Sequence, residues 1–340
     1  MAARAFITGL AGLEVSANER AFLREAQPWG LIIFKRNVST HAQVQAFARS
    51  FRDILGWEAP VLVDQEGGRV QRLGPPQWPV YPPGARYSAI YDREPAAGLA
   101  AARLAGRLIA ADLHALGIDV DCLPIADVPV VDGDPVIGDR AYGSEPAKVA
   151  AIAGAIAHGL LAGGVLPVLK HLPGHGRATA DSHARLPVVD TDRAILEASD
   201  FAAFRPLAQL PLGMTAHVVF SAIDPVAPAT TSVTMVREVI RGFIGFQGLL
   251  MSDDVSMGAL SGTIPERSRA ALAAGCDVVL HCNGDLAEMT AVAGAAPMLS
   301  GAAAKRAEAA LAARSAPQDF DVEAARKIFD ETIAQRNKVS

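Results

Sequence analysis

Short apolar runs alternate with amphipathic stretches along most of the chain. Each apolar run has the length of a strand buried on both faces, and the stretches between them repeat apolar residues at helical spacing. The expected strands cover residues 5–10, 30–34, 60–63, 120–125, 165–169, 212–216, 248–251 and 277–280. The expected helices include residues 40–55, 94–116, 146–162, 192–207 and 265–274. This alternation is typical of an α/β fold with a parallel sheet.

The number and order of these elements predict a closed barrel rather than an open sheet. Eight strand candidates that alternate with helices match a (β/α)8 TIM-type barrel. No Pro-, Gly- or Ser-rich linker divides the chain, and the alanine-rich segment 301–337 predicts one or two extra C-terminal helices. We therefore expect residues 1–340 to form a single domain. Helix-capping residues are expected at Ser39 or Thr40, Ser144, Thr191 or Asp192, and Ser232 or Thr234.

Composition and charge limit which classes of partner the chain could bind. Hydrophobic residues make up 51% of the chain and charged residues 20%, which is an ordinary globular balance. The net charge of -5 is spread along the chain, whereas nucleic-acid binding needs a concentrated basic surface. The three cysteines are odd in number, which is typical of unpaired thiols in a reducing compartment. Apolar residues 5–13 lack the features of a secretory signal, and no run is long enough for a membrane span. We expect a soluble, cytoplasmic chain.

Polar residues collect where the expected strands end. Asp64 follows the third strand, Lys170 the fifth and Asp253 the seventh. In a barrel these ends meet at one rim, where active sites are built, so the sequence predicts a site there. Taken singly, Asp64 could instead cap a loop, and Arg140 could form a surface ion pair. Asp253 and Asp254 are adjacent on a strand and should point to opposite faces, so we expect only one of them at the rim.

One pair of histidines raises the question of a metal site. His171 and His175 are four residues apart, which is the helical spacing of a metal-binding pair. Pro173 and Gly174 lie between them and break a helix. We therefore expect no metal and no other cofactor.

Five segments carry a resemblance to a known family. They are 64–72 (Asp-Gln-Glu-Gly-Gly-Arg-Val-Gln-Arg), 137–140 (Ile-Gly-Asp-Arg), 170–176 (Lys-His-Leu-Pro-Gly-His-Gly), 181–183 (Asp-Ser-His) and 251–257 (Met-Ser-Asp-Asp-Val-Ser-Met). In order and spacing they resemble the bacterial β-N-acetylhexosaminidases (β-N-acetylglucosaminidases) of glycoside hydrolase family 3. The resemblance is to the short, single-domain type that acts in peptidoglycan recycling.

The resemblance implies a retaining glycosidase, which needs a nucleophilic carboxylate and a proton donor. Asp253 matches the nucleophile, and Asp181 and His183 match an acid/base dyad. The residues that match the family's sugar-binding groups are Asp64, Arg72, Arg140, Lys170 and His171. Lys170 or Arg140 is expected to favour the ionised form of Asp253.

The implied reaction is the removal of terminal β-linked N-acetylglucosamine from small carbohydrates. The implied substrates are N-acetylglucosaminyl-1,6-anhydro-N-acetylmuramic acid and its peptide conjugates. Another family-3 β-glycosidase, or an N-acetylglucosaminide phosphorylase that uses phosphate in place of water, stays open as the alternative. A metal-dependent barrel hydrolase and a non-catalytic sugar-binding protein are less favoured classes. We expect a monomer, because a single closed barrel can function alone, with no nucleic-acid or membrane partner.

Overall fold

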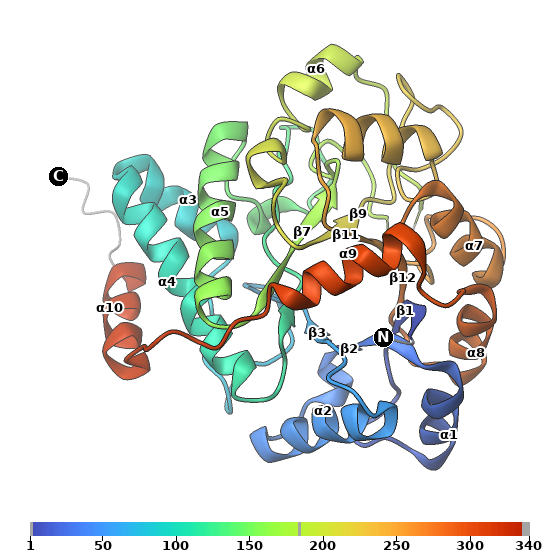
Figure 1. Cartoon of the computed structure of the whole chain (residues 1–340). Coiled ribbons are helices and arrows are strands. Elements are labelled where there is room, and N and C mark those ends of the chain that lie inside the picture. Colours follow the sequence, from blue (N-terminus) through green and yellow to red (C-terminus); the bar gives the residue numbers. More distant parts are fainter. Residues whose placement is uncertain (1–2, 183–184, 335–340) are drawn as a thin grey trace.

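The computed structural model describes residues 3–182 and 185–334, and its centre is a closed parallel barrel (Figure 1). The barrel strands are β1 (Arg4–Thr8), β2 (Pro28–Ile33), β3 (Val61–Val63), β6 (Val120–Asp121), β7 (Leu166–Leu172), β9 (Leu212–Thr215), β11 (Leu249–Asp254) and β12 (Val278–His281). They pair in chain order, and β12 closes the barrel on β1, where Phe6 pairs with Val279. Each expected apolar run overlaps one barrel strand, so the predicted (β/α)8 fold is confirmed.

The barrel strands form where the sequence permits burial on both faces. Every residue of β2, β3, β7, β9 and β12 is buried, as expected for parallel strands covered by helices. Two small sheets lie outside the barrel: β4 (Gln65–Gly67) pairs with β5 (Val70–Gln71), and β8 (Val188–Val189) pairs with β10 (Val219–Phe220). Because β4 directly follows β3, the first small sheet shapes the loop at the C-terminal end of that strand.

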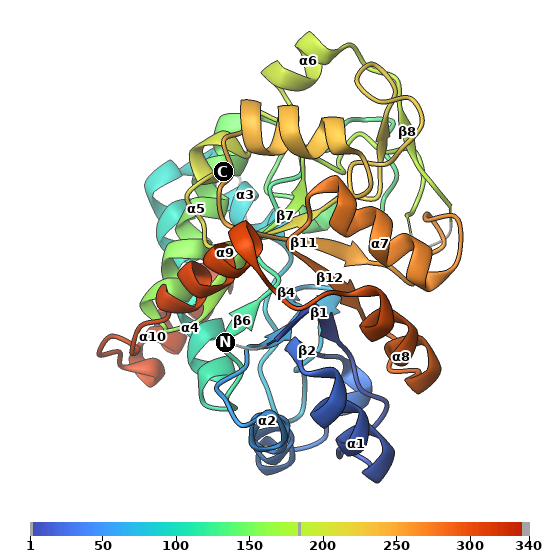
Figure 2. The ribbon, with the colours of Figure 1, turned by 45° about the vertical axis from the view of Figure 1, so that its right-hand side comes forward.

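Helices surround the barrel (Figures 1 and 2). They include α1 (Ala17–Ala26), α2 (His41–Leu55), α3 (Gly84–Arg93), α4 (Pro95–His114), α5 (Pro146–Ala162), α6 (Arg193–Ala198), α7 (Ile264–Ala274) and α8 (Leu286–Ala295), with a π-helix at Met235–Phe243. The helices α4 and α5 pack closely, because Gly106 of α4 lies against the backbone of Ile156, where a Cβ atom would not fit.

The C-terminal segment forms α9 (Gly301–Ala312) and α10 (Val322–Ala334), which confirms the expected extra helices. Arg306 of α9 forms an ion pair with Asp277, directly before β12, so α9 lies over the N-terminal ends of the strands. The helix α10 packs against α4, and its Phe329 ring lies 6.1 Å from the ring of Tyr81.

The prediction of one continuous helix over residues 192–207 is wrong. The helix α6 ends at Ala198, and a separate 3-10 turn covers Arg205–Leu207. The break lies at Asp200, which is buried and paired with Arg177 at 2.9 Å. That ion pair ties the chain after α6 to the segment that follows β7.

The expected caps hold in part. Thr40 caps α2, since its hydroxyl accepts a hydrogen bond from the Gln43 N–H at 3.2 Å. The N-cap of α5 is Glu145 rather than Ser144, because Pro146 takes the first helical position, where a missing N–H costs nothing. Asp192 precedes α6 without a side-chain capping bond.

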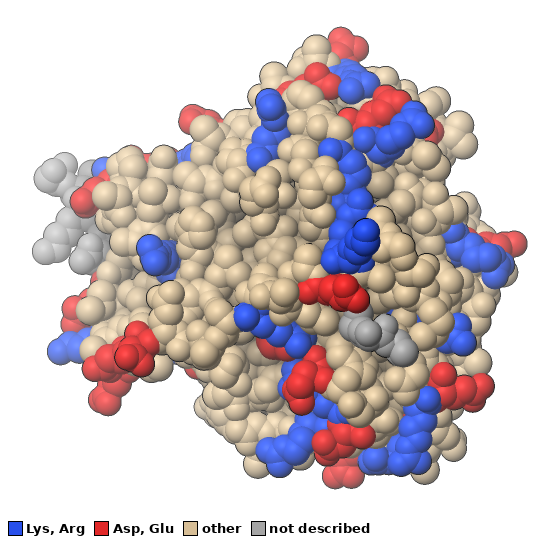
Figure 3. Space-filling view, viewed as in Figure 1, with Lys and Arg blue, Asp and Glu red and all other residues tan. Residues whose placement is uncertain are grey.

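Acidic and basic side chains are intermixed on the face shown in Figure 3, in keeping with the small net charge of -5. Within residues 3–182 and 185–334, no helix is both long and apolar enough to cross a bilayer.

Candidate active site

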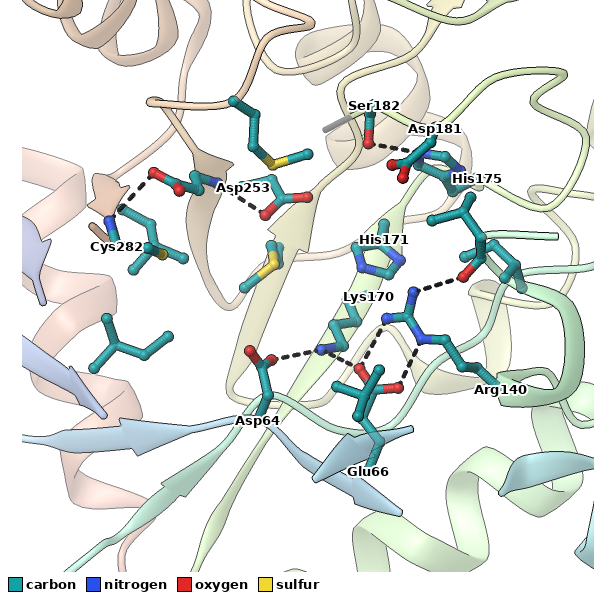
Figure 4. A pocket seen from close by; sticks show the side chains of 18 of the residues that line it. Asp64, Glu66, Arg140, Lys170, His171, His175, Asp181, Ser182, Asp253 and Cys282 are labelled. Carbon is teal, nitrogen blue, oxygen red and sulfur yellow. Dashed lines mark hydrogen bonds and ion pairs between the residues drawn. The ribbon is translucent and has the colours of Figure 1, made fainter. Parts of the chain in front are cut away.

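A pocket of about 460 Å³ opens at the C-terminal ends of the barrel strands (Figure 4). Barrel geometry explains why residues far apart in the sequence meet there, since every strand points its C-terminal end at the same rim. The predicted residues that line the pocket are Asp64, Arg72, Arg140, Lys170, His171, Asp181 and Asp253. The eighth predicted residue, His183, lies outside the described residues. The strand-end prediction therefore located the pocket.

One side of the pocket is a network of buried charges. Lys170 Nζ lies 2.9 Å from Asp64 Oδ1 and 2.7 Å from Glu66 Oε1. Arg72 Nη2 donates to Asp64 Oδ2 at 2.8 Å, and Arg140 binds both oxygens of Glu66 at 2.9 and 2.8 Å. Burial by itself would raise the pKa of Asp64, but Lys170 and Arg72 more than offset it and hold that pKa well below its ordinary value. The network presents ordered donors and acceptors to a polar ligand.

Glu66 is the member of this network that the sequence analysis did not select. It is 7% exposed and joins two cations that come from different strand ends, Lys170 and Arg140. Its place beside Asp64 in the run 64–72 was a usable signal, but the sequence does not show which way its side chain turns after β3. The antiparallel pair β4 and β5 sets that direction.

The two adjacent aspartates at the end of β11 both line the pocket, so the expectation that only one would face the rim is wrong. Their carboxylates nevertheless differ. Asp254 accepts hydrogen bonds from Ser256 Oγ at 2.7 Å, Ser256 N at 3.0 Å and Cys282 N at 3.2 Å. Asp253 accepts a single hydrogen bond within the described residues, from the N–H of Asp254 at 2.8 Å. Asp254 is thus engaged by its neighbours, whereas one carboxylate oxygen of Asp253 accepts no hydrogen bond from a described residue.

The surroundings of Asp253 favour its ionised form. Burial alone would raise its pKa, but His217, His171 and the N–H of Asp254 hold it below its ordinary value of 3.8. Of the two cations expected to act in this way, Lys170 contributes in the same sense. Arg140 instead forms its ion pair with Glu66.

A second buried cluster joins the ends of β6 and β7. Strand β7 extends to Leu172, beyond its expected end, and carries both Lys170 and His171. His171 Nδ1 lies 2.7 Å from Asp127 Oδ2, and the His175 N–H donates to Asp127 Oδ1 at 2.6 Å. The sequence analysis missed Asp127, although it follows the fourth expected strand as Asp64 follows the third.

The His175 ring contacts the loop that carries Asp181. His175 Nε2 lies 3.0 Å from Ser182 Oγ, and both side chains line the pocket. Burial first, and then repulsion from His171, lower the pKa of His175 to about 4, so this imidazole is neutral near pH 7. Among the residues that the structure describes, no three His, Cys, Asp or Glu side chains cluster as a metal site requires.

Comparisons with known proteins identify the family of the chain. Residues 6–312 match the glycosyl hydrolase family 3 N-terminal domain. A β-hexosaminidase of Alkalilimnicola ehrlichii is 41% identical over 279 residues, which cover 81% of this chain and 79% of that protein. A crystal structure of NagZ from Neisseria gonorrhoeae in complex with N-trifluoroacetyl-D-glucosamine is similar, with a TM-score of 0.87 and 30% identity over 98% of this chain and 99% of that one.

A second similar structure is a family 3 β-N-acetylglucosaminidase from a Paenibacillus strain. It is 28% identical with a TM-score of 0.81, and the match covers 99% of this chain and 63% of that one. The barrel and its carboxylate-lined pocket are those of a glycoside hydrolase. The chain belongs to glycoside hydrolase family 3, and it is a hydrolase of the β-hexosaminidase type.

Proposed function

We propose that this chain is a retaining exo-β-N-acetylglucosaminidase that acts through a covalent glycosyl-enzyme on Asp253. The observation that carries the proposal is the Asp253 carboxylate, which is held ionised in the pocket and has an oxygen that no described residue engages. Asp181 lines the same pocket, on the loop after β7. A nucleophilic carboxylate and a proton donor on the leaving-group side are the two groups that retention requires.

In the first step an Asp253 oxygen bonds to the anomeric carbon of the sugar while the bond from that carbon to the leaving oxygen breaks. His183, which the proposal assigns to an acid/base dyad with Asp181, gives its proton to the leaving oxygen. In the second step the imidazole takes a proton from water, and the water oxygen displaces Asp253. Two displacements at one carbon retain its configuration. Each displacement has a lower activation barrier than a single unassisted one, because the nucleophile is preorganised.

The charged network supports recognition of the sugar. Arg72 and Lys170 both contact Asp64, so their remaining donors and the Asp64 acceptors are fixed in place for ring hydroxyl groups. Arg140 and His171, which line the same pocket, complete the proposed binding set. The proposed ligand is a small carbohydrate, and the chemistry requires no cofactor.

The proposed substrates are N-acetylglucosaminyl-1,6-anhydro-N-acetylmuramic acid and its peptide conjugates. The match over 98% of this chain and 99% of the Neisseria NagZ chain supports a single domain of that type. We further propose that the enzyme is monomeric and cytoplasmic, a location in keeping with three free, buried cysteines.

The deciding experiment is covalent trapping with a 5-fluoro N-acetylglucosaminide, followed by peptide mass spectrometry. We expect a sugar adduct on Asp253, and Asp253→Ala should abolish turnover of every substrate, including activated aryl glycosides. An adduct on Asp254 would contradict the proposal. Turnover that requires added phosphate, or prefers aryl glucoside, would instead support the phosphorylase or another family-3 β-glycosidase.

A further inference from the structure

Asp127 is a buried carboxylate that does not line the sugar pocket. It lies in the loop after β6, which is tied to the end of β7 because the Ala126 N–H donates to the Lys170 carbonyl at 2.8 Å. Ile125 also forms an isolated parallel bridge with Lys170. Two neighbouring strand ends are thus held in register where Asp127 meets β7.

Three N–H groups converge on the Asp127 carboxylate. Its Oδ2 accepts from His171 Nδ1 at 2.7 Å, and its Oδ1 accepts from the backbone N–H of His175 at 2.6 Å. The backbone N–H of His171 lies farther from Oδ1, at 3.4 Å. Only an ionised carboxylate offers two acceptor oxygens to such a set, because an amide has one oxygen and an NH2 group. Burial alone would raise the pKa of Asp127, but His171 and these hydrogen bonds keep it below its ordinary value.

The contact with Oδ2 decides which ring nitrogen of His171 the ligand meets. Since the ionised Asp127 can only accept, Nδ1 carries the proton in this contact. His171 Nε2 makes no hydrogen bond within the described residues, and His171 lines the pocket beside Lys170 (Figure 4). In the neutral ring, Nε2 is then an acceptor that faces the sugar hydroxyl groups.

We propose that Asp127 is a positioning residue for sugar binding: it fixes the orientation and the tautomer of His171 so that Nε2 is presented to the pocket. The inference rests on the proposed function, in which His171 contacts the sugar. Asp127 itself touches no substrate and acts through its neighbour.

The tautomer is measured directly by nitrogen NMR of enzyme labelled with 15N-histidine. The chain has eight histidines, and the His171→Gln spectrum identifies the signals of His171. We expect Nδ1–H in the wild type and a shift towards Nε2–H in Asp127→Asn, because the amide turns an N–H group or a weaker acceptor towards Nδ1. A wild-type ring protonated on Nε2 alone would overturn the proposal. That reading needs neither a variant of Asp127 nor turnover.

Kinetics separate positioning from general support of the fold. With an aryl N-acetylglucosaminide, Asp127→Asn should lower kcat/KM by about 10- to 100-fold, mainly through KM, as expected for one lost hydrogen bond to a charged group. In the His171→Gln background, Asp127→Asn should have little further effect on kcat/KM, because the imidazole through which Asp127 acts is already absent. Asp277→Asn is the matched control: it alters a buried aspartate with two arginine partners near the opposite end of the barrel and should leave KM unchanged.

Losses that add fully in the double variant would overturn the proposal. A failure of the proposed function would give a different result: the wild type itself would then neither turn over the N-acetylglucosaminide nor form an adduct. The NMR measurement would still decide the role of Asp127 in that case.

Discussion

Asp64 and Asp253 both line the pocket and are both held ionised, yet their partners suit different tasks. Asp64 forms ion pairs with Lys170 and Arg72, and a carboxylate bound to two cations is a poor nucleophile. Asp253 has no ion pair with an arginine or lysine within the described residues, and its one hydrogen bond comes from a backbone N–H. The immediate contacts of each carboxylate thus support the proposed division between binding by Asp64 and attack by Asp253.

The contacts of Glu66 lead to a prediction in the same way, because this buried carboxylate pairs with two cations. Glu66→Gln keeps the shape of the side chain but leaves Lys170 and Arg140 without their shared negative charge. We expect the free energy of unfolding to fall by about 3–5 kcal/mol, since breaking a buried pair leaves an uncompensated charge. KM should rise as well, because both cations belong to the proposed binding set.

Urea denaturation and steady-state kinetics at pH 7 measure these two effects. The control is Glu197→Gln, which removes a partly exposed ion pair with Arg193 four residues away on α6. That change should cost about 0.3–0.5 kcal/mol and leave KM unaltered. Equal destabilisation by the two variants would show that Glu66 is not the structural centre of the network.

At the scale of elements, two side-chain contacts hold the first part of the segment between β7 and α6. Arg177 binds the buried Asp200, and His175 binds Ser182. These contacts place Asp181 at the pocket although the loop has little regular structure of its own. The Arg177–Asp200 ion pair thus links the loop after β7 to the chain just after α6.

The second prediction concerns this loop. Ser182→Ala removes the hydroxyl next to His175 Nε2 and leaves the backbone of the Asp181 segment less restrained. Loss of one such hydrogen bond should lower kcat by about 3- to 10-fold for substrates with poor leaving groups. Activated aryl glycosides should be nearly unaffected, because their leaving oxygen needs no proton.

A series of aryl N-acetylglucosaminides of graded leaving-group pKa tests this selectivity. Ser268→Ala is a suitable control: it removes another buried hydroxyl, bonded to the Ile264 carbonyl within α7, and should leave the whole series unchanged. If Ser182→Ala slowed every substrate equally, the hydroxyl would serve the fold and not proton transfer.

The sequence predicts the strands more completely than it predicts the side chains beyond the strand ends. Buried strands are marked by continuous apolar runs, so all eight were found, and the barrel rule then placed Asp64, Lys170 and Asp253 at one rim. The directions of side chains beyond a strand end depend on tertiary contacts. Glu66 and Asp127 were therefore missed, since each owes its role to partners on other strands.

On the scale of the whole molecule, charged groups at the two ends of the barrel serve different purposes. At the N-terminal strand ends, Asp119 binds Arg52 and Arg314, and Asp277 binds Arg241 and Arg306. These ion pairs fasten helices to the barrel. The C-terminal end gathers the pocket network and His175. This asymmetry, with stability at one end and chemistry at the other, is characteristic of TIM barrels.

The third prediction concerns the pH dependence of the free energy of unfolding, to which His175 contributes. His175 has a pKa of about 4 in the folded chain against an ordinary value of 6.5, so the folded state binds this proton more weakly than the unfolded state. Its contribution is therefore fully present above pH 6.5 and is lost as the pH falls through about 4. The difference corresponds to about 3 kcal/mol. Asp64, Glu66, Asp127 and Asp253, whose pKa values are also lowered, add a further loss below about pH 4.

Urea unfolding at intervals from pH 7.5 to 3 resolves the two stages. Between pH 6.5 and 4 the wild type should lose stability relative to His175→Gln, which keeps a polar group near Ser182 but does not titrate. Below pH 4 both proteins should lose stability together, because the carboxylates remain in the variant. Asp121, whose pKa is raised well above its ordinary value by burial, acts in the opposite sense: it adds stability as the pH falls towards 3.8, in both proteins alike, so the contribution of His175 is the difference between the two curves. Parallel curves for the two proteins between pH 6.5 and 4 would mean that another group carries the first stage.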